Sequence, residues 1–334
     1  MKKIKLIVKT TSKKYSINIG LNIVKKISNI IKFNKINFEK CIIIVDKKVP
    51  KKKLLDLKNN LLCKKKIIHF FSPSEKNKNQ KNVNIILNKL FKNNFNRNDC
   101  IISLGGGITG DVASFAASTF KRGIKFINIP TTLLAQVDSS IGGKTGINNK
   151  YGKNLIGTFF QPDLVVADTS FLGSLPRREL ICGYAEIFKH SLIAGKKYFS
   201  YIEKNKFKIL KLKSPYIEKA IAESCKIKKN IIEIDEKEKK IRKLLNLGHT
   251  FAHAYEAETG YSKKLNHGEA VILGIYSAAK FSLSNKLLTK KKYLKIISHI
   301  NDLNLPNNIK TFFGKKNINS ILKFMKSDKK NNSN

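Results

Sequence analysis

The chain has 334 residues, of which 42% are hydrophobic, and its formal net charge is +43 at pH 7. The hydrophobic fraction excludes an intrinsically disordered chain, and the length predicts two domains with sizeable cores. Apolar runs such as CIIIV at 41–45 are far too short to span a bilayer, and the basic N-terminal segment lacks the apolar core of a secretory signal.

The first half of the chain alternates predicted strands and helices. Short apolar segments bounded by turn residues predict strands at 4–8, 15–19, 41–46, 66–71, 100–104, 125–130 and 164–168. Apolar residues at helical spacing predict helices at 21–32, 51–62, 77–93 and 108–120. This alternation is typical of an α/β fold and predicts a Rossmann-like, doubly wound parallel sheet.

Strand signals end near residue 175. Segments with helical periodicity follow at 176–194, 198–211, 216–233, 247–259, 267–285 and 290–302. We therefore expect an α/β domain at 1–175 followed by an all-helical domain at 176–334.

Charge and cysteine usage indicate the environment of the protein. The basic excess is mostly lysine, spread along a chain that is also rich in asparagine and isoleucine. Compositional bias explains it at least as well as nucleic-acid binding, so we expect anionic substrates and no specific nucleic-acid or membrane partner. Five scattered cysteines without a C-x-x-C pair predict a reducing, cytoplasmic location.

The first glycine-rich loop follows the strand predicted at 100–104. Gly105, Gly107 and Gly110 have the G-x-G-x-x-G spacing between a strand and a helix. Backbone N–H groups can approach a pyrophosphate at such a helix N-terminus. The acidic residue usual about twenty positions later is missing, and Asp46 is the alternative partner for ribose hydroxyls.

The second glycine-rich loop spans 136–157. Gly143-Lys144-Thr145 resembles the end of a phosphate-binding P-loop, but the first glycine of that motif falls on Asp138, so the match fails. An ordinary surface loop is one interpretation. Lys144, Lys153 and Asn154 supply convergent donors and Asp138 a carboxylate, which favours a phosphate or polyol site.

A third polar segment lies at 240–270. Arg242, Asn246, His249 and His253 are separated by four, three and four positions, which predicts one stripe along a single helix. His267 follows before another apolar helical run. Because three of the six histidines of the chain lie within nineteen positions, we favour a metal or catalytic role over ordinary structural histidines.

The helix predicted at 176–194 adds a carboxylate to this histidine cluster. Glu186 and Lys189 are three residues apart and share a helix face, where an exposed ion pair is the simpler interpretation. With two histidines, however, Glu186 would complete a Glu-His-His metal site with open positions. The H-E-x-x-H spacing of a zinc protease is absent.

Together these segments resemble the 3-dehydroquinate synthase family of sugar phosphate cyclases. The resemblance covers most of the chain and is densest from 103 to 270. It rests on GGGITGD (105–111), KRG (121–123), PTTLLAQVDSSIGGKT (130–145), GKNLIG (152–157), LPRRE (175–179), GYAEIFKH (183–190), RKLLNLGHTFAHA (242–254) and HGEA (267–270).

The resemblance implies a zinc ion, or Co²⁺, held by Glu186, His249 and His267. It implies NAD contacts from Asp46, Glu75, Lys78, Gly105, Gly106, Gly107, Asp111, Thr131, Thr132, Lys144, Lys153, Ser174, Leu175 and Glu179. It implies substrate contacts from Arg122, Asp138, Asn154, Lys228, Lys329 and Lys330, and catalytic roles for Lys144, Lys189, Arg242, Asn246 and His253.

The implied activity is that of a phosphorus–oxygen lyase of the shikimate pathway in aromatic amino acid biosynthesis. Its substrate is 3-deoxy-D-arabino-heptulosonate 7-phosphate, and its products are 3-dehydroquinate and phosphate. The resemblance also implies a homodimer in which Arg122 reaches the neighbouring subunit's phosphate site. The alternatives are a related sugar phosphate cyclase, a metal-dependent polyol dehydrogenase with the same two-domain plan, and a non-catalytic protein that binds nucleic acid.

Overall fold

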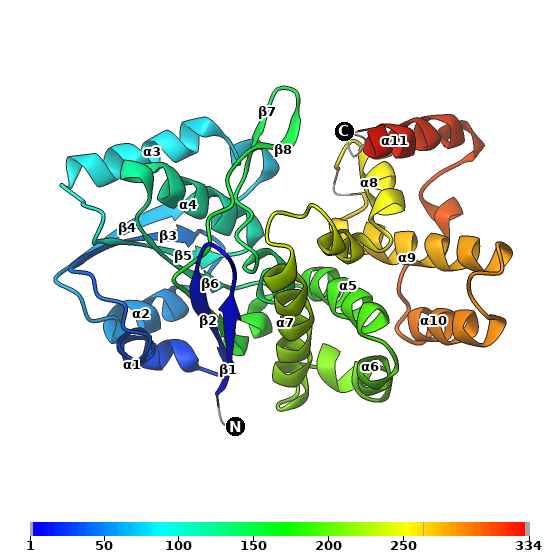
Figure 1. Cartoon of the computed structure of the whole chain (residues 1–334), viewed down its shortest axis with the longest axis horizontal. Helices are drawn as coiled ribbons and strands as arrows, with labels where there is room; N and C mark the ends of the chain where they lie inside the picture. The colour runs from blue at the N-terminus through cyan, green and yellow to red at the C-terminus, as the bar shows by residue number, and fades with distance from the viewer. Residues whose placement is uncertain (1–2, 263, 331–334) are drawn as a thin grey trace. The chain divides into compact units, whose positions relative to one another are not determined.

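The structure, a computed structural model, describes residues 3–262 and 264–330, without the side chains of 327–330. It comprises two compact units (Figure 1). The first contains 1–176 and 212–238, and the second contains 177–211 and 239–334. The sequence instead predicts a helical domain for all residues from 176 onward. Among the described helices, none is long and apolar enough to cross a membrane.

A seven-stranded sheet forms the centre of the first unit. Its strands are β1 (Ile4–Lys9), β2 (Lys14–Gly20), β3 (Lys40–Asp46), β4 (Lys65–Phe71), β5 (Cys100–Gly105), β6 (Lys125–Pro130) and β9 (Leu164–Asp168). The order is β1-β2-β9-β6-β5-β3-β4, and all neighbours are parallel except the β1–β2 hairpin. The predicted doubly wound sheet is therefore confirmed, with an antiparallel edge.

Both faces of this sheet are covered, which explains why its strands are continuously apolar. Alternate residues of β3 enter different cores: Ile43 packs with Ile27 and Leu57, whereas Ile42 packs with Val83 and Val112. The first core lies against α1 (Ile27–Phe33) and α2 (Lys51–Asn60), and the second lies against α3 (Gln80–Lys92) and α4 (Gly107–Thr119).

The strand order creates a ligand-binding position at the carboxyl end of the sheet. The chain moves outward from β3 to β4 and then returns to place β5 on the other side of β3. At such a switch point the loops leaving the two strands diverge and open a crevice. The residues that end β3 and β5 here are Asp46 and Gly105.

Two further elements belong to the first unit. A short hairpin, β7 (Ile147–Asn149) and β8 (Gly152–Ile156), interrupts the loop that the sequence left without structure. Helix α7 (Tyr216–Ile234) packs on β1 and β2. Beyond its C-terminus, Glu236 accepts hydrogen bonds from Thr11 and Gln161 at 2.5 and 2.8 Å. These contacts explain why 212–238 belongs to this unit.

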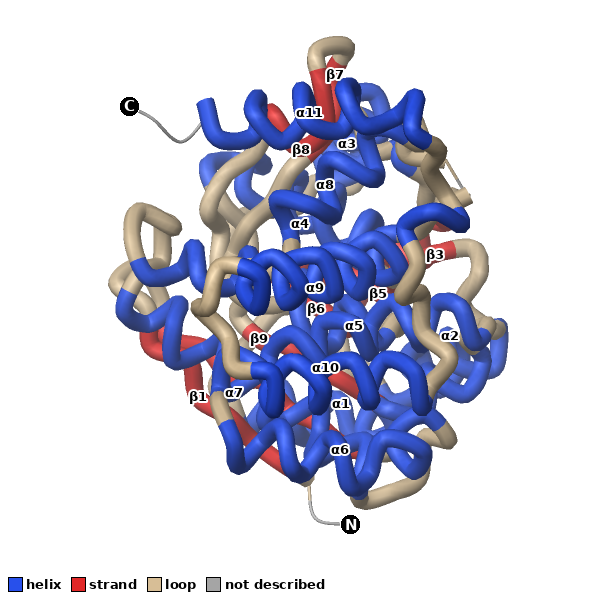
Figure 2. Tube along the Cα trace, turned by 90° about the vertical axis from the view of Figure 1, so that its right-hand side faces the viewer, coloured by secondary structure: helices blue, strands red, loops and turns tan. Residues whose placement is uncertain are grey.

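The second unit is helical, as predicted. It contains α5 (Arg177–Ala194), α6 (Lys196–Leu210), α8 (His249–Glu258), α9 (His267–Ser284), α10 (Lys290–Asp302) and α11 (Ile318–Lys330). Helix α9 packs against α5, α8 and α10, and α11 packs against α8. In the view of Figure 2, the labels of α9, α5, α10 and α6 follow one another from top to bottom. The sequence did not predict α11.

Candidate active site

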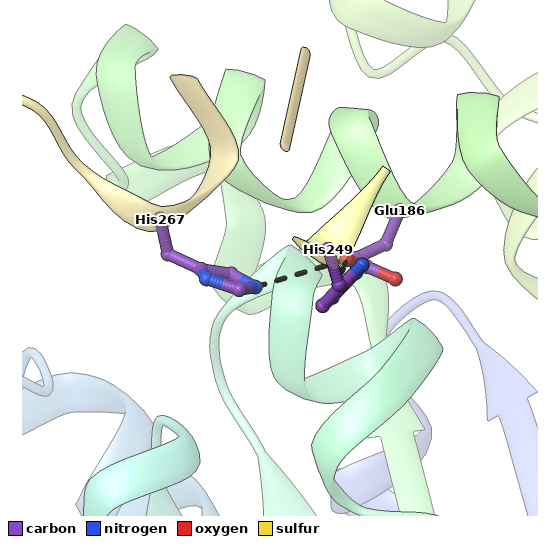
Figure 3. A group of neighbouring side chains, drawn as sticks. All are labelled: Glu186, His249 and His267. Carbon is purple, nitrogen blue, oxygen red and sulfur yellow. Dashed lines mark ion pairs between the residues drawn. The ribbon is translucent and has the colours of Figure 1, made fainter. Parts of the chain in front are cut away.

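Three helices of the second unit bring together one carboxylate and two imidazoles (Figure 3). Glu186 lies in the middle of α5, while His249 and His267 are the first residues of α8 and α9. The Nε2 atoms of His249 and His267 lie 3.7 and 3.8 Å from Oε1 of Glu186. One ligand atom from each residue lies within 4.8 Å of the other two. The group therefore has the donors and the spacing of a metal site.

Zinc fits this group on chemical grounds. The Glu186 side chain is only 1% exposed, and its Oε1 makes no hydrogen bond within the described part of the chain. Both imidazole distances to it are too long for hydrogen bonds, which leaves space for an ion between the three groups. One carboxylate and two imidazoles are a common donor set for Zn²⁺ and also suit Co²⁺.

The electrostatics of the group are asymmetric. Burial raises the pKa of Glu186, but the charge of Lys189 and the nearby histidines hold this pKa well below its usual range. Burial lowers the pKa of His249 to about 4, so this imidazole is neutral at pH 7 and ready to donate its lone pair. Burial also disfavours charge on His267, but the carboxylates of Glu186 and Glu256 raise its pKa to about 10.

Glycine allows the helices that carry the ligands to approach closely. A Cβ on Gly268 of α9 would lie 2.2 Å from the Cα of Cys182 on α5. A Cβ on Gly274 would lie 2.2 Å from the carbonyl oxygen of Gly248, which directly precedes α8. Gly248 also has a φ of +79°, which favours glycine. These contacts set the separation of the ligands.

Polar contacts orient the first turn of α9. Glu269 accepts from the backbone N–H of Asn266, whose side chain accepts from the backbone N–H of Glu269, so the two form a capping box. Arg178, in the first turn of α5, donates to both carboxylate oxygens of Glu269 at 2.7 and 2.6 Å. The Asn-x-x-Glu spacing was visible in the sequence, but the Arg178 partner was not.

The predicted helical stripe is wrong. Arg242 and Asn246 lie on a separate 3₁₀ segment, Ile241–Asn246, and α8 begins only at His249. The reason is Gly248, whose left-handed conformation breaks the helix. Only His249 and His253 share a face of α8, with ring centroids 5.3 Å apart. Arg242 is buried, whereas Asn246 and His253 are exposed.

The predicted NAD residues gather at the switch point of the first unit. A Cβ on Gly105 would lie 2.9 Å from that of Asp46, and a Cβ on Gly106 would lie 3.0 Å from Thr132. The N–H of Thr131 donates to the Gly105 carbonyl at 2.9 Å. Strand β5, helix α4 and the loop after β6 thus form one backbone cradle, in which a side chain on Gly106 or Gly105 would fill the space.

Lysines connect the predicted NAD-binding residues with the second glycine-rich loop. Lys78, only 4% exposed, donates to Asp111 and to Asn154 of β8, at 2.5 Å in each case. Lys153 lies 3.7 Å from Glu75. Residues Lys78, Asp111, Asn154, Lys153 and Glu75 are therefore neighbours, as a shared binding region requires.

Asp138 and Lys144, also in the first unit, each contact a charged residue of the segment 212–238. Lys228 of α7 donates to the side chain and the carbonyl of Asp138, both at 2.7 Å. Lys144 forms an ion pair with Glu238. Glu238 was missed by the sequence analysis, because it lies in a run of charged residues with no distinguishing spacing.

The remaining predicted residues do not join these groups by a described contact. Arg122 is exposed, with a φ of +64° at the end of the short turn Phe120–Arg122. Ser174 and Leu175 lie just before Pro176, where the first stretch of unit 1 ends, and Glu179 lies in the first turn of α5. Lys329 and Lys330 lie on the last turn of α11, but their side chains lie outside the described part of the structure.

Comparisons with known proteins agree with one another. Residues 68–182 match the family described as 3-dehydroquinate synthase N-terminal, and residues 183–331 match 3-dehydroquinate synthase C-terminal. A 3-dehydroquinate synthase of Pelagibacter ubique (strain HTCC1062) is 62% identical over 329 residues, which cover 98% of this chain and 89% of that protein.

Solved structures show the same architecture. A crystal structure of 2-deoxy-scyllo-inosose synthase is similar with a TM-score of 0.85 and 26% identity, covering 96% of this chain and 88% of that one. Another, complexed with carbaglucose-6-phosphate, NAD⁺ and Co²⁺, is similar with a TM-score of 0.83 and 26% identity, covering 96% and 86%.

The contact between α5 and α9 generates a first prediction. Gly268→Ala places a methyl group against the backbone of Cys182. A change of side-chain rotamer cannot relieve this clash, so the backbone of α5 or α9 must shift. We expect a loss of about 1–3 kcal/mol in the free energy of unfolding, measured with urea, and weaker zinc binding in a chelator competition. Gly314→Ala is the matched control, because within the described part of the chain no atom beyond its two chain neighbours lies within 4 Å of its added Cβ. Wild-type zinc affinity and stability in Gly268→Ala would show that this contact does not set the site.

Proposed function

The chain belongs to the 3-dehydroquinate synthase family, and we propose that its site carries out the reaction of this family. The protein converts 3-deoxy-D-arabino-heptulosonate 7-phosphate into 3-dehydroquinate and inorganic phosphate, which makes it a phosphorus–oxygen lyase of the shikimate pathway. The observation that carries the proposal is the group formed by buried Glu186 with His249 and His267, with one ligand atom of each within 4.8 Å of the others.

We assign the metal to this group and the nucleotide to the first unit. Glu186, His249 and His267 would hold Zn²⁺, with Co²⁺ as a substitute; when bound, such an ion lowers the pKa of an adjacent substrate hydroxyl. The relative crystallised with NAD⁺ and Co²⁺ supports this pairing of cofactors. When bound, NAD would supply a hydride acceptor and donor.

The cradle at the switch point supports the NAD assignment. Backbone N–H groups of the glycine loop at the start of α4 suit a pyrophosphate, because they point along the positive end of a helix dipole. Asp46, buried beside that loop, suits ribose hydroxyls. The proposed NAD contacts are Asp46, Glu75, Lys78, Gly105, Gly106, Gly107, Asp111, Thr131, Thr132, Lys144, Lys153, Ser174, Leu175 and Glu179.

The cationic residues support an anionic, phosphorylated substrate. Lys189 is 2% exposed, and in this environment its charge acts with little screening by water. Arg242 offers the planar fork that binds a phosphate through two hydrogen bonds. We assign substrate binding or catalysis to Lys144, Lys189, Arg242, Asn246, His253, Arg122, Asp138, Asn154, Lys228, Lys329 and Lys330.

These side chains have distinct tasks in the proposed reaction. Lysine and arginine donors hold the phosphate and stabilise it as it leaves. Exposed His253, on the same face of α8 as His249, is suited to relay a proton between a substrate oxygen and water. The overall reaction has no net redox change, so NAD would be needed only in catalytic amounts.

The domain roles, oligomer and location complete the proposal. We assign NAD binding to residues 1–175 and metal and substrate binding to 176–334, with the segment 212–238 folded into the first unit. Arg122 is exposed and is therefore available to a neighbouring subunit, as the proposed homodimer requires. A cytoplasmic location is supported by five free cysteines.

The metal assignment is tested by phosphate release. His249→Ala should abolish turnover and tight zinc binding, since the remaining residues provide one carboxylate and one imidazole. The assay follows inorganic phosphate released from the heptulosonate phosphate, with and without a chelator. His69→Ala is the control, because His69 pairs with Lys89 in the first unit. Full activity with stoichiometric zinc in His249→Ala would refute the assignment, and NADH accumulating in step with turnover would identify a dehydrogenase instead.

The homodimer is tested by mixing two impaired variants. Arg122→Ala should lose about ten- to a hundredfold in turnover efficiency, the effect of removing one hydrogen bond to a charged group, while it keeps its zinc. Mixing it with His249→Ala subunits should restore part of the activity, because each mixed dimer would hold one site with an intact metal group and an intact arginine. If labelled subunits exchange and no activity returns, Arg122 acts within its own chain.

A further inference from the structure

The two histidines of the metal group differ in what holds the second nitrogen of each ring. The Nδ1 of His249 lies 3.3 Å from the carbonyl oxygen of Leu247, a neutral acceptor. The Nδ1 of His267 lies 3.2 Å from Oε2 of Glu256, a carboxylate. Each Nε2 faces Glu186. The Nδ1 of each imidazole thus has an oxygen partner, but only the partner of His267 carries a formal charge.

Helix periodicity explains how Glu256 reaches His267. Glu256 follows His249 by seven residues, which is about two turns of α8 and places both on one face of the helix. Helix α8 therefore supplies one metal-binding imidazole at its start and a carboxylate for the second imidazole near its end. The Glu256 side chain is 14% exposed, so water screens its interaction with the ring only weakly.

A carboxylate behind an imidazole has two physical effects. It fixes the ring orientation and the tautomer, because Nδ1 must carry a proton to donate a hydrogen bond to the carboxylate. It also increases the electron density at Nε2 and makes that nitrogen a better ligand. A backbone carbonyl, as at His249, gives the orientation with a smaller electronic effect.

We propose that Glu256 is the positioning residue of this metal site, tuning its affinity and the asymmetry of its two imidazoles through His267. The inference rests on the proposed metal assignment and adds a residue that touches neither the ion nor the substrate. Removal of such a partner typically lowers metal affinity by about 10- to 100-fold.

Two substitutions separate orientation from charge. Glu256→Gln retains an oxygen acceptor for the Nδ1 proton but removes the charge, and we expect zinc affinity to fall by about tenfold or less. Glu256→Ala removes both, and we expect a loss toward the upper end of the 10- to 100-fold range. Affinity is measured in the full-length protein by competition with a chelator of known zinc affinity. The visible spectrum of the Co²⁺-loaded protein reports ligand geometry independently of activity.

Glu258→Gln is the matched control. It is the same substitution on the same helix, but Glu258 accepts from Asn317 and Ser320, both at 2.5 Å, next to α11. We expect wild-type zinc affinity and an unchanged Co²⁺ spectrum in this variant, even if its melting temperature falls.

The outcomes distinguish failure of the Glu256 role from failure of the proposed metal assignment. If the wild-type protein binds no zinc, the metal assignment itself fails. If it binds zinc tightly, and both Glu256 variants keep this affinity and the wild-type Co²⁺ spectrum, the positioning role is overturned while the proposed function stands. A lower melting temperature of the metal-free Glu256 variants with unchanged zinc affinity would likewise overturn it, because Glu256 would then only tie α8 to α9.

Discussion

The buried carboxylate of Glu186 is the interaction on which the helical unit depends. An isolated carboxylate at 1% exposure would cost several kcal/mol relative to water. The adjacent Lys189 offsets part of this cost, and the imidazoles that begin α8 and α9 face the same oxygen. The packing of three helices is thereby coupled to the chemistry of one anion.

Small residues and outer hydrogen bonds make this arrangement possible. Gly268 and Gly274 let α9 approach its neighbours at backbone distance, and the ion pair of Arg178 with Glu269 connects the first turns of α5 and α9. In the first unit, the same principle appears at Gly105 and Gly106, where the absence of side chains leaves a backbone cradle. In both units, therefore, glycine supports close approach beside a proposed ligand.

The sequence predicted the sheet well, because strands buried on both faces leave continuous apolar runs between breakers. It also identified Glu186, His249 and His267 as a group, through histidine clustering and then family resemblance. It failed where three-dimensional proximity decides. The prediction that Arg242 lies on the same helix as His249 was wrong, because Gly248 adopts a left-handed conformation beside α9 and separates the two segments. Glu256 stayed unnoticed, because its partner His267 lies on another helix.

X-ray absorption fine structure of the zinc-loaded protein tests whether Glu186, His249 and His267 are the metal ligands. We expect only oxygen and nitrogen atoms bonded to the zinc, with the multiple scattering of two imidazoles. Cys182 should not be among these ligands, because the ligand atoms that lie within 4.8 Å of one another come from Glu186, His249 and His267. Sulfur at about 2.3 Å, or the scattering of fewer than two imidazoles, would contradict the assignment of Glu186, His249 and His267 as the metal ligands.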